Sequence, residues 1–197
     1  MDRNHVKLYD KGPVLRVETT INDPVQFKVL RVKDGHRQWC PVRKTVADLY
    51  RFYQVGRASN QRYLDALAAA GDYRQGVIAL DRLAVPAATG NDNTPASNPI
   101  DNKDLVVFRA VLAGEHLIIG FRNTHIQARL WPRPPTDPVE AKRRCAYVPR
   151  RLSTLRGHGL IAKVPRHRLY RVTPYGQRVM SAAIAIYDHD FPTAYAA

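Results

Sequence analysis

Basic residues are concentrated in the C-terminal third of the chain. Residues 140–178 hold 11 Lys and Arg but a single acid, Glu140. Cations at this density neutralise phosphates, and an Arg side chain also donates two hydrogen bonds to one guanine. A solvated basic face is the structural alternative. We predict a phosphate-bearing partner, contacted by Lys142, Arg143, Arg144, Arg150, Arg151, Ser153, Arg156, Arg166, His167, Arg168 and Arg171.

A second polar cluster lies on a predicted N-terminal hairpin. Residues 4–9 and 14–21 alternate in polarity around the turn 10–13, and this turn would place Lys7 opposite Arg16. Like charges directly opposite each other are unfavourable unless an anion lies over them. The candidate anion contacts are therefore His5, Lys7, Tyr9 and Arg16. Two alternatives stay open: a solvated face bridged by Glu18, or a nucleophilic Tyr9 assisted by His5 and Glu18.

Metal and nucleotide motifs are absent from the sequence. His36 and Cys40 are four residues apart, but no second pair accompanies them and no His-hydrophobe-His motif occurs. The patterns GxxxxGK[ST], GxGxxG and GxSxG are also missing. We expect no metal and no cofactor, and the sequence favours a binding protein over an enzyme.

Composition narrows the class of protein. The 197 residues are 45% hydrophobic and 24% charged, with a net charge of +14, which excludes wholesale disorder and favours a polyanionic partner. No apolar run approaches the roughly 20 residues that span a bilayer, and residues 1–10 lack a signal-peptide core. Two cysteines cannot form a disulfide framework. We expect a cytoplasmic protein with no membrane contact.

The predicted elements define an α+β domain over residues 1–83. Two hairpins come first, the second turning at Lys33-Asp34-Gly35. The helical spacing of Val46, Leu49, Tyr50 and Tyr53 then predicts a helix with these residues facing the core. Residues 84–103 are rich in Pro, Gly, Asn and Ala and are predicted to form a linker.

Residues 104–197 predict a second domain of helices and one small hairpin. Helices are expected near 104–112, 123–130 and 137–158, the last beginning at Asp137-Pro138 and kinked or divided at Pro149. Two strands and a basic tip follow, then a final helix that begins at Thr173-Pro174. The apolar stretch Val179–Tyr187 in that helix either packs within its own domain or pairs with a second copy in a homodimer.

Residues 105–185, and above all the segment RRLSTLRGHGLIAKVPRHRLYRVTPYGQRV, resemble the winged helix-turn-helix DNA-binding domain. The resemblance implies that a third helix turns Leu152 and Leu155 inward and basic side chains toward the major groove. It also implies that the partner is duplex DNA and that the tip between the strands approaches the backbone or minor groove. On this resemblance the residues expected to read base edges are Arg150, Arg151, Ser153 and Arg156. Phosphate contacts, which supply affinity without sequence information, are expected mainly from Lys142, Arg143, Arg144, Arg166, Arg168 and Arg171. Pro149 and the long WPRPPTDP connection depart from the usual pattern.

KLYDKGPVLRVETTINDPVQFKV, followed by a Tyr-rich stretch and GFRNTHIQARL, is similar to the C-terminal half of a family of longer, uncharacterised bacterial proteins. This similarity runs almost end to end, implies no specific activity, and suggests that an N-terminal portion is absent. We expect a bacterial DNA-binding protein with a transcriptional or mobile-element role. The alternatives are a fragment of a replication-initiator-like enzyme that lacks its catalytic portion, and a winged protein–protein module.

Overall fold

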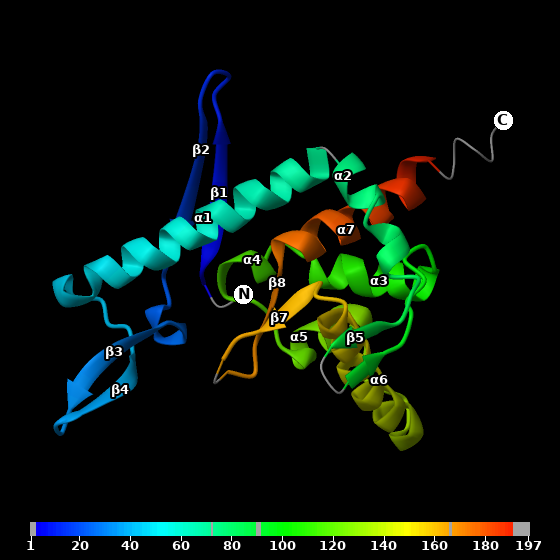
Figure 1. Cartoon of the computed structure of the whole chain (residues 1–197). Helices are drawn as coiled ribbons and strands as arrows, with labels where there is room; N and C mark the ends of the chain where they lie inside the picture. Colours follow the sequence, from blue (N-terminus) through cyan, green and yellow to red (C-terminus); the bar gives the residue numbers. More distant parts are fainter. Residues whose placement is uncertain (1–2, 72, 90–91, 166, 191–197) are drawn as a thin grey trace. The chain divides into compact units, whose positions relative to one another are not determined.

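The computed structural model describes residues 3–71, 73–89, 92–165 and 167–190 (Figure 1). They form two compact units: unit 1 comprises Met1–Leu64 with Leu117–Ile119, and unit 2 comprises Asp65–His116 with Gly120–Ala197. Each unit contains helices and antiparallel hairpins, so the α+β class is confirmed. The division falls within the long helix α1 (Leu49–Gly71) and not at residues 84–103.

Two hairpins open unit 1. Strand β1 (His5–Asp10) pairs with β2 (Leu15–Thr20), and β3 (Lys28–Lys33) pairs with β4 (His36–Pro41). The predicted turn at the tip of the second hairpin is present. Asp34 and Gly35 both adopt positive φ, at 53° and 73°, as a two-residue turn of the type I′ class requires.

The register of the first hairpin differs from the prediction by two residues. Lys7 lies opposite Glu18, and Arg16 lies opposite Tyr9. The loop begins one residue later than expected: Lys11 donates its backbone N–H to Val14 O at 3.1 Å, and Asp10 still pairs with Leu15. A two-residue shift keeps each side chain on its expected face, but it separates the two cations that the sequence had placed together.

The core of unit 1 is small and lies on one side of α1. Its buried residues are Phe27, Val42, Val55 and Ile118, with Phe52 packed against them. The guanidinium of Arg62 donates to the carbonyl oxygens of Leu117 and Ile118, which holds the returning segment Leu117–Ile119 against the same side of α1.

The predicted core stripe of the first helix is therefore wrong. The 3-10 turn η2 (Val46–Asp48) precedes α1, and the residues with apolar helical spacing along this stretch face solvent. The inward positions are Phe52, Val55 and the fully buried Ser59. The other apolar side chains of this core belong to parts of the chain that are distant in sequence, so spacing alone could not identify the inward face of α1.

Unit 2 is built from helices around one apolar core. These are α2 (Arg74–Val77), α3 (Asn102–Val111), α5 (Asn123–Leu130), α6 (Pro138–Gly157) and α7 (Pro174–Ala185), while α4 (His116–Ile119) spans the boundary between the units. Strands β7 (Ile161–Lys163) and β8 (Tyr170–Val172) form a hairpin between α6 and α7. Phe121 pairs with the β8 edge of this hairpin, because it exchanges backbone hydrogen bonds of 2.9 and 2.8 Å with Tyr170.

The segment expected as a linker is part of unit 2. It contains the hairpin of β5 (Ala87–Thr89) and β6 (Asp92–Thr94), which lies against α6. A ring nitrogen of His158 lies 2.9 Å from Pro95 O, and a Cβ at Gly157 would lie 1.9 Å from the hydroxyl oxygen of Thr94. The absence of apolar periodicity in residues 84–103 reflects a short hairpin held by polar contacts.

Helix α7 buries its apolar face within unit 2. Val179, Met180, Ala182 and Ala183 are fully buried, and the helix packs closely on α2. Gly76 permits that approach, because a Cβ there would lie 2.2 Å from Arg178 O. The apolar surface expected to pair with a second copy is thus occupied by the chain's own residues.

Candidate nucleic-acid interface

Helix α6 carries most of the residues predicted to contact DNA. Its start follows the predicted signal: the Asp137 carboxylate accepts a hydrogen bond from Glu140 N at 2.7 Å, and Pro138 occupies the first turn. The helix continues through Pro149 without division. Because proline lacks an N–H, the carbonyl of Cys145 receives no helical hydrogen bond, and both residues lie on the exposed side of the helix.

The inner face of α6 agrees with the prediction. Leu152 and Leu155 are buried, together with Val148. With about 100° between successive residues, one outward arc of about 120° contains the exposed residues Lys142, Arg150, Ser153 and Arg156. Arg143 is also exposed and lies beside this arc. We refer to Lys142, Arg150, Ser153 and Arg156 as the outward face of α6.

Arg144 does not lie on the outward face. Its guanidinium donates to the Glu140 carboxylate and to Arg133 O, each at 2.7 Å, and stacks 5.4 Å from the Trp131 ring centroid. Hydrogen bonds from Thr136 N–H and then from Arg144 lower the pKa of Glu140 to about 2. Arg144 therefore anchors the proline-rich connection onto α6, and the predicted phosphate contact does not fit its position.

Arg151 is also engaged inside unit 2. It donates to the Asp104 carboxylate at 2.9 Å, and its guanidinium lies 5.2 Å from the Tyr147 ring centroid. Asp104 is only 6% exposed and accepts a second hydrogen bond from the Ser97 hydroxyl at 2.6 Å. Arg151 thus compensates a buried carboxylate, and the expectation that it reads bases does not fit this geometry.

The β7–β8 hairpin presents further cations. Arg168 and Arg171 are exposed as predicted, and His167 is half-buried. Arg166 lies outside the described residues. Lys163 is exposed at the end of β7, opposite Tyr170, and sequence reasoning missed it. Its place at the end of a three-residue strand, next to the basic tip, was the signal that could have identified it.

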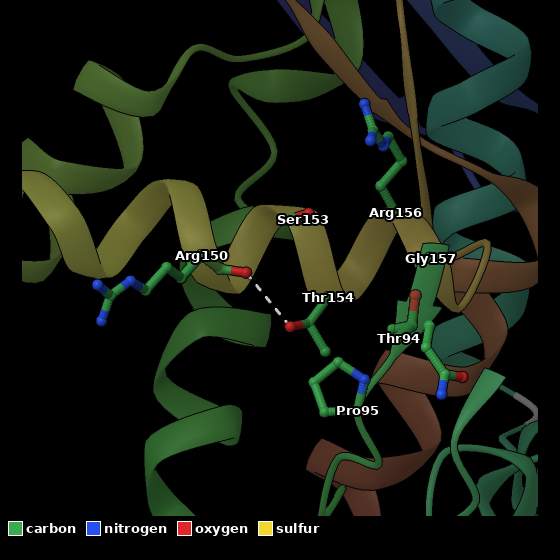
Figure 2. Close-up of a pocket in the computed structure, with 8 residues that line it drawn as sticks. Thr94, Pro95, Arg150, Ser153, Thr154, Arg156 and Gly157 are labelled. Atoms are coloured by element: carbon green, nitrogen blue, oxygen red, sulfur yellow. Dashed lines mark hydrogen bonds between the residues drawn. The ribbon is translucent and has the colours of Figure 1, made fainter. Parts of the chain in front are cut away.

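A pocket of about 650 Å³ lies along the outward face of α6, on its C-terminal half (Figure 2). Arg150 and Arg156 extend from well-separated points of its helical wall, and the opposite wall is formed by Thr94 of β6 and the following residue, Pro95. Thr154 also lines the pocket, and its hydroxyl donates to Arg150 O at 3.2 Å. Asn93 also lines the pocket. Sequence reasoning missed Asn93 because its segment was assigned to a linker.

The N-terminal cluster does not gather cations as predicted. Arg16 forms an ion pair with Glu18, which also lies opposite Lys7 on the neighbouring strand. The argument for an anion contact at His5, Lys7, Tyr9 and Arg16 depended on Lys7 facing Arg16, so it loses its premise.

No group of three or more His, Cys, Asp or Glu side chains that could hold a metal ion occurs among the described residues. In the same part of the chain, no helix combines the length and apolar character needed to cross a membrane. Comparison of the chain with family models, curated proteins and solved structures finds no match.

Proposed function

We propose that unit 2 binds duplex DNA with the outward face of α6 in the major groove. The observation that carries this proposal is the separation of charge on α6. Its one acid, Glu140, is paired with Arg144 at 2.7 Å, and Lys142, Arg150 and Arg156 have no acidic partner among the described residues. A helix face with uncompensated cations and no exposed acid is suited to a phosphate-lined groove.

The order of elements in unit 2 supports a winged helix-turn-helix arrangement. Helices α3, α5 and α6 are followed by the β7–β8 hairpin, and Phe121, just before α5, pairs with Tyr170 of β8. In a winged helix the hairpin is the wing, and the third helix enters the groove. On this proposal Lys163, Arg168 and Arg171 of the wing contact phosphates.

The spacing on α6 suggests how the two roles divide. Lys142 and Arg156 are 14 residues apart, which is about 21 Å along a helix. The major groove is about 12 Å wide, so a helix of this length crosses it with both ends near the backbones. Arg150 and Ser153 lie between these ends, where base edges are within reach. We propose Arg150 as the principal base-reading residue.

Fluorescence anisotropy tests the proposal with a labelled duplex that is recovered from a random-sequence pool by selection for binding to the full chain. The double variant R150A/R156A is compared with R82A/R178A, which removes two exposed arginines of unit 2 that lie outside α6 and the wing. We expect R150A/R156A to weaken binding at least thirtyfold, because each contact contributes about 1–3 kcal/mol, and R82A/R178A to change it less than threefold. Equal losses in the two variants would show that net charge, and not this helix face, determines binding.

A further inference from the structure

A row of apolar side chains on unit 1 faces solvent. Val46 is 87% exposed, Leu49 64%, Tyr50 71% and Tyr53 57%, and their spacing places them within one arc of about 100° along η2 and α1. We call these four residues the α1 stripe. Scattered exposed apolar residues are ordinary, but a contiguous row on one helix face marks a contact surface.

The two tyrosines of the stripe form a small aromatic platform. Their ring centroids are 6.2 Å apart and their planes differ by 28°, so both rings present their faces in similar directions. The guanidinium of Arg57, one turn further along α1, lies within hydrogen-bond reach of the Tyr53 hydroxyl at 3.4 Å. A cation therefore stands at one end of the platform.

The charge around the stripe is strongly positive. From Gly35 to Leu64 the sequence contains six Lys or Arg and one acid, Asp48. Asp48 is 3% exposed, and its carboxylate is occupied by the Arg31 side chain and by the backbone N–H of Arg43. The exposed side chains of Arg43 and Lys44 lie just before the stripe, and Arg57 lies just after it. A partner on this surface must offer negative charge together with flat apolar groups.

We propose that the α1 stripe binds single-stranded nucleic acid, with bases stacked on Tyr50 and Tyr53 and phosphates near Lys44 and Arg57. Unpaired bases supply the flat apolar faces, and the backbone supplies the charge. In a duplex those faces are covered by neighbouring base pairs. A second copy of this chain fits less well, since an antiparallel two-fold pairing of the stripe would bring Arg57 near Arg43 and Lys44 of the other copy. This site is separate from the outward face of α6 and does not rest on its function.

Anisotropy of fluorescein-labelled dT20 with the full chain tests this site. Y50A/Y53A should weaken dT20 binding about a hundredfold, or about tenfold per ring, and should change duplex binding less than twofold. The matched control Y50F/Y53F keeps both rings and should retain dT20 affinity within threefold. Both substituted positions are exposed, so the variants should keep the circular dichroism spectrum and melting temperature of the parent chain. A 5-iodouracil photocrosslink, mapped by mass spectrometry, should fall on Tyr50 or Tyr53.

Two results would overturn the proposal. The first is unchanged dT20 affinity in Y50A/Y53A, with the crosslink located elsewhere. The second is a dimer, seen by sedimentation velocity without nucleic acid, that Y50A/Y53A dissociates while dT20 binding stays the same. The second result would assign the stripe to a second copy of the chain. Neither result bears on duplex binding by α6, which the R150A/R156A variant tests separately.

Discussion

Replacing Arg151 by Ala should destabilise unit 2 and leave duplex affinity nearly unchanged. The substitution removes the cation that lies 2.9 Å from the buried carboxylate of Asp104, and among the described residues it leaves the Ser97 hydroxyl as the side-chain partner of that carboxylate. Breaking a fully buried ion pair costs about 3–5 kcal/mol. The Arg151 side chain is 32% exposed, so water can partly replace it, and we expect a loss of about 2–3 kcal/mol in the free energy of unfolding.

Urea denaturation followed by circular dichroism measures this loss, and a second background isolates its cause. In D104N the buried group is neutral, so removing Arg151 should cost less than about 1 kcal/mol. Anisotropy under conditions where the variant is folded should show less than a twofold change in duplex affinity. If R151A keeps its stability and loses tenfold or more in affinity, the ion pair is not its principal role, and Arg151 contacts DNA as its sequence position suggested.

Two further predictions concern the stability of unit 2. G76V should lower the free energy of unfolding by about 2–3 kcal/mol, because the valine side chain would collide with Arg178 O on α7. The control G71A, where a Cβ has open space, should be neutral or slightly stabilising. Thermal unfolding followed by circular dichroism compares the two variants. Burial lowers the pKa of His116, so the unfolded chain takes up a proton more readily than the folded one, and stability should fall as the pH drops below about 6.5. The loss of stability should approach at most about 1.4 kcal/mol per pH unit. Urea titrations at pH 7.5, 6.5 and 5.5 measure it, and H116Q should show a flatter dependence of the free energy of unfolding on pH. An unchanged pH dependence in H116Q would contradict the assignment to His116.

Local signals in the sequence predicted local structure well. Asp137-Pro138 and Thr173-Pro174 each mark the first turn of a helix, and Asp34-Gly35 forms the expected turn. In each case the determining interactions lie within four residues. The carboxylate of Asp137 and the hydroxyl of Thr173 accept from backbone N–H groups three residues ahead, so no distant part of the chain was needed to predict them.

The errors arose where distant residues determine the outcome. Tyr50 and Tyr53 have the spacing of a core stripe, but Phe27, Val42 and Ile118 lie on the other side of α1. Arg151 lies in a basic stretch, yet its partner Asp104 is 47 residues away. Spacing shows which residues share a face, and composition shows where charge is concentrated. Neither identifies what packs against that face or which cations already have an acidic partner.

The ion pairs of two basic residues on α6 lead to a prediction about salt. Arg144 and Arg151 are held by carboxylates, so they should release few counterions when DNA binds. The exposed cations that we propose to contact phosphates are Lys142, Arg143 and Arg156 on α6, and Lys163, Arg168 and Arg171 on the hairpin.

Six phosphate contacts imply a slope of about −5 in a plot of log affinity against log salt concentration. Affinity should then fall about a thousandfold between 50 and 200 mM salt. R168A should make the slope shallower by about one unit, and R151A should leave it unchanged. A slope shallower than about −2 in the parent chain would mean that these six side chains do not face the backbone together, and the proposed docking of α6 would have to be abandoned.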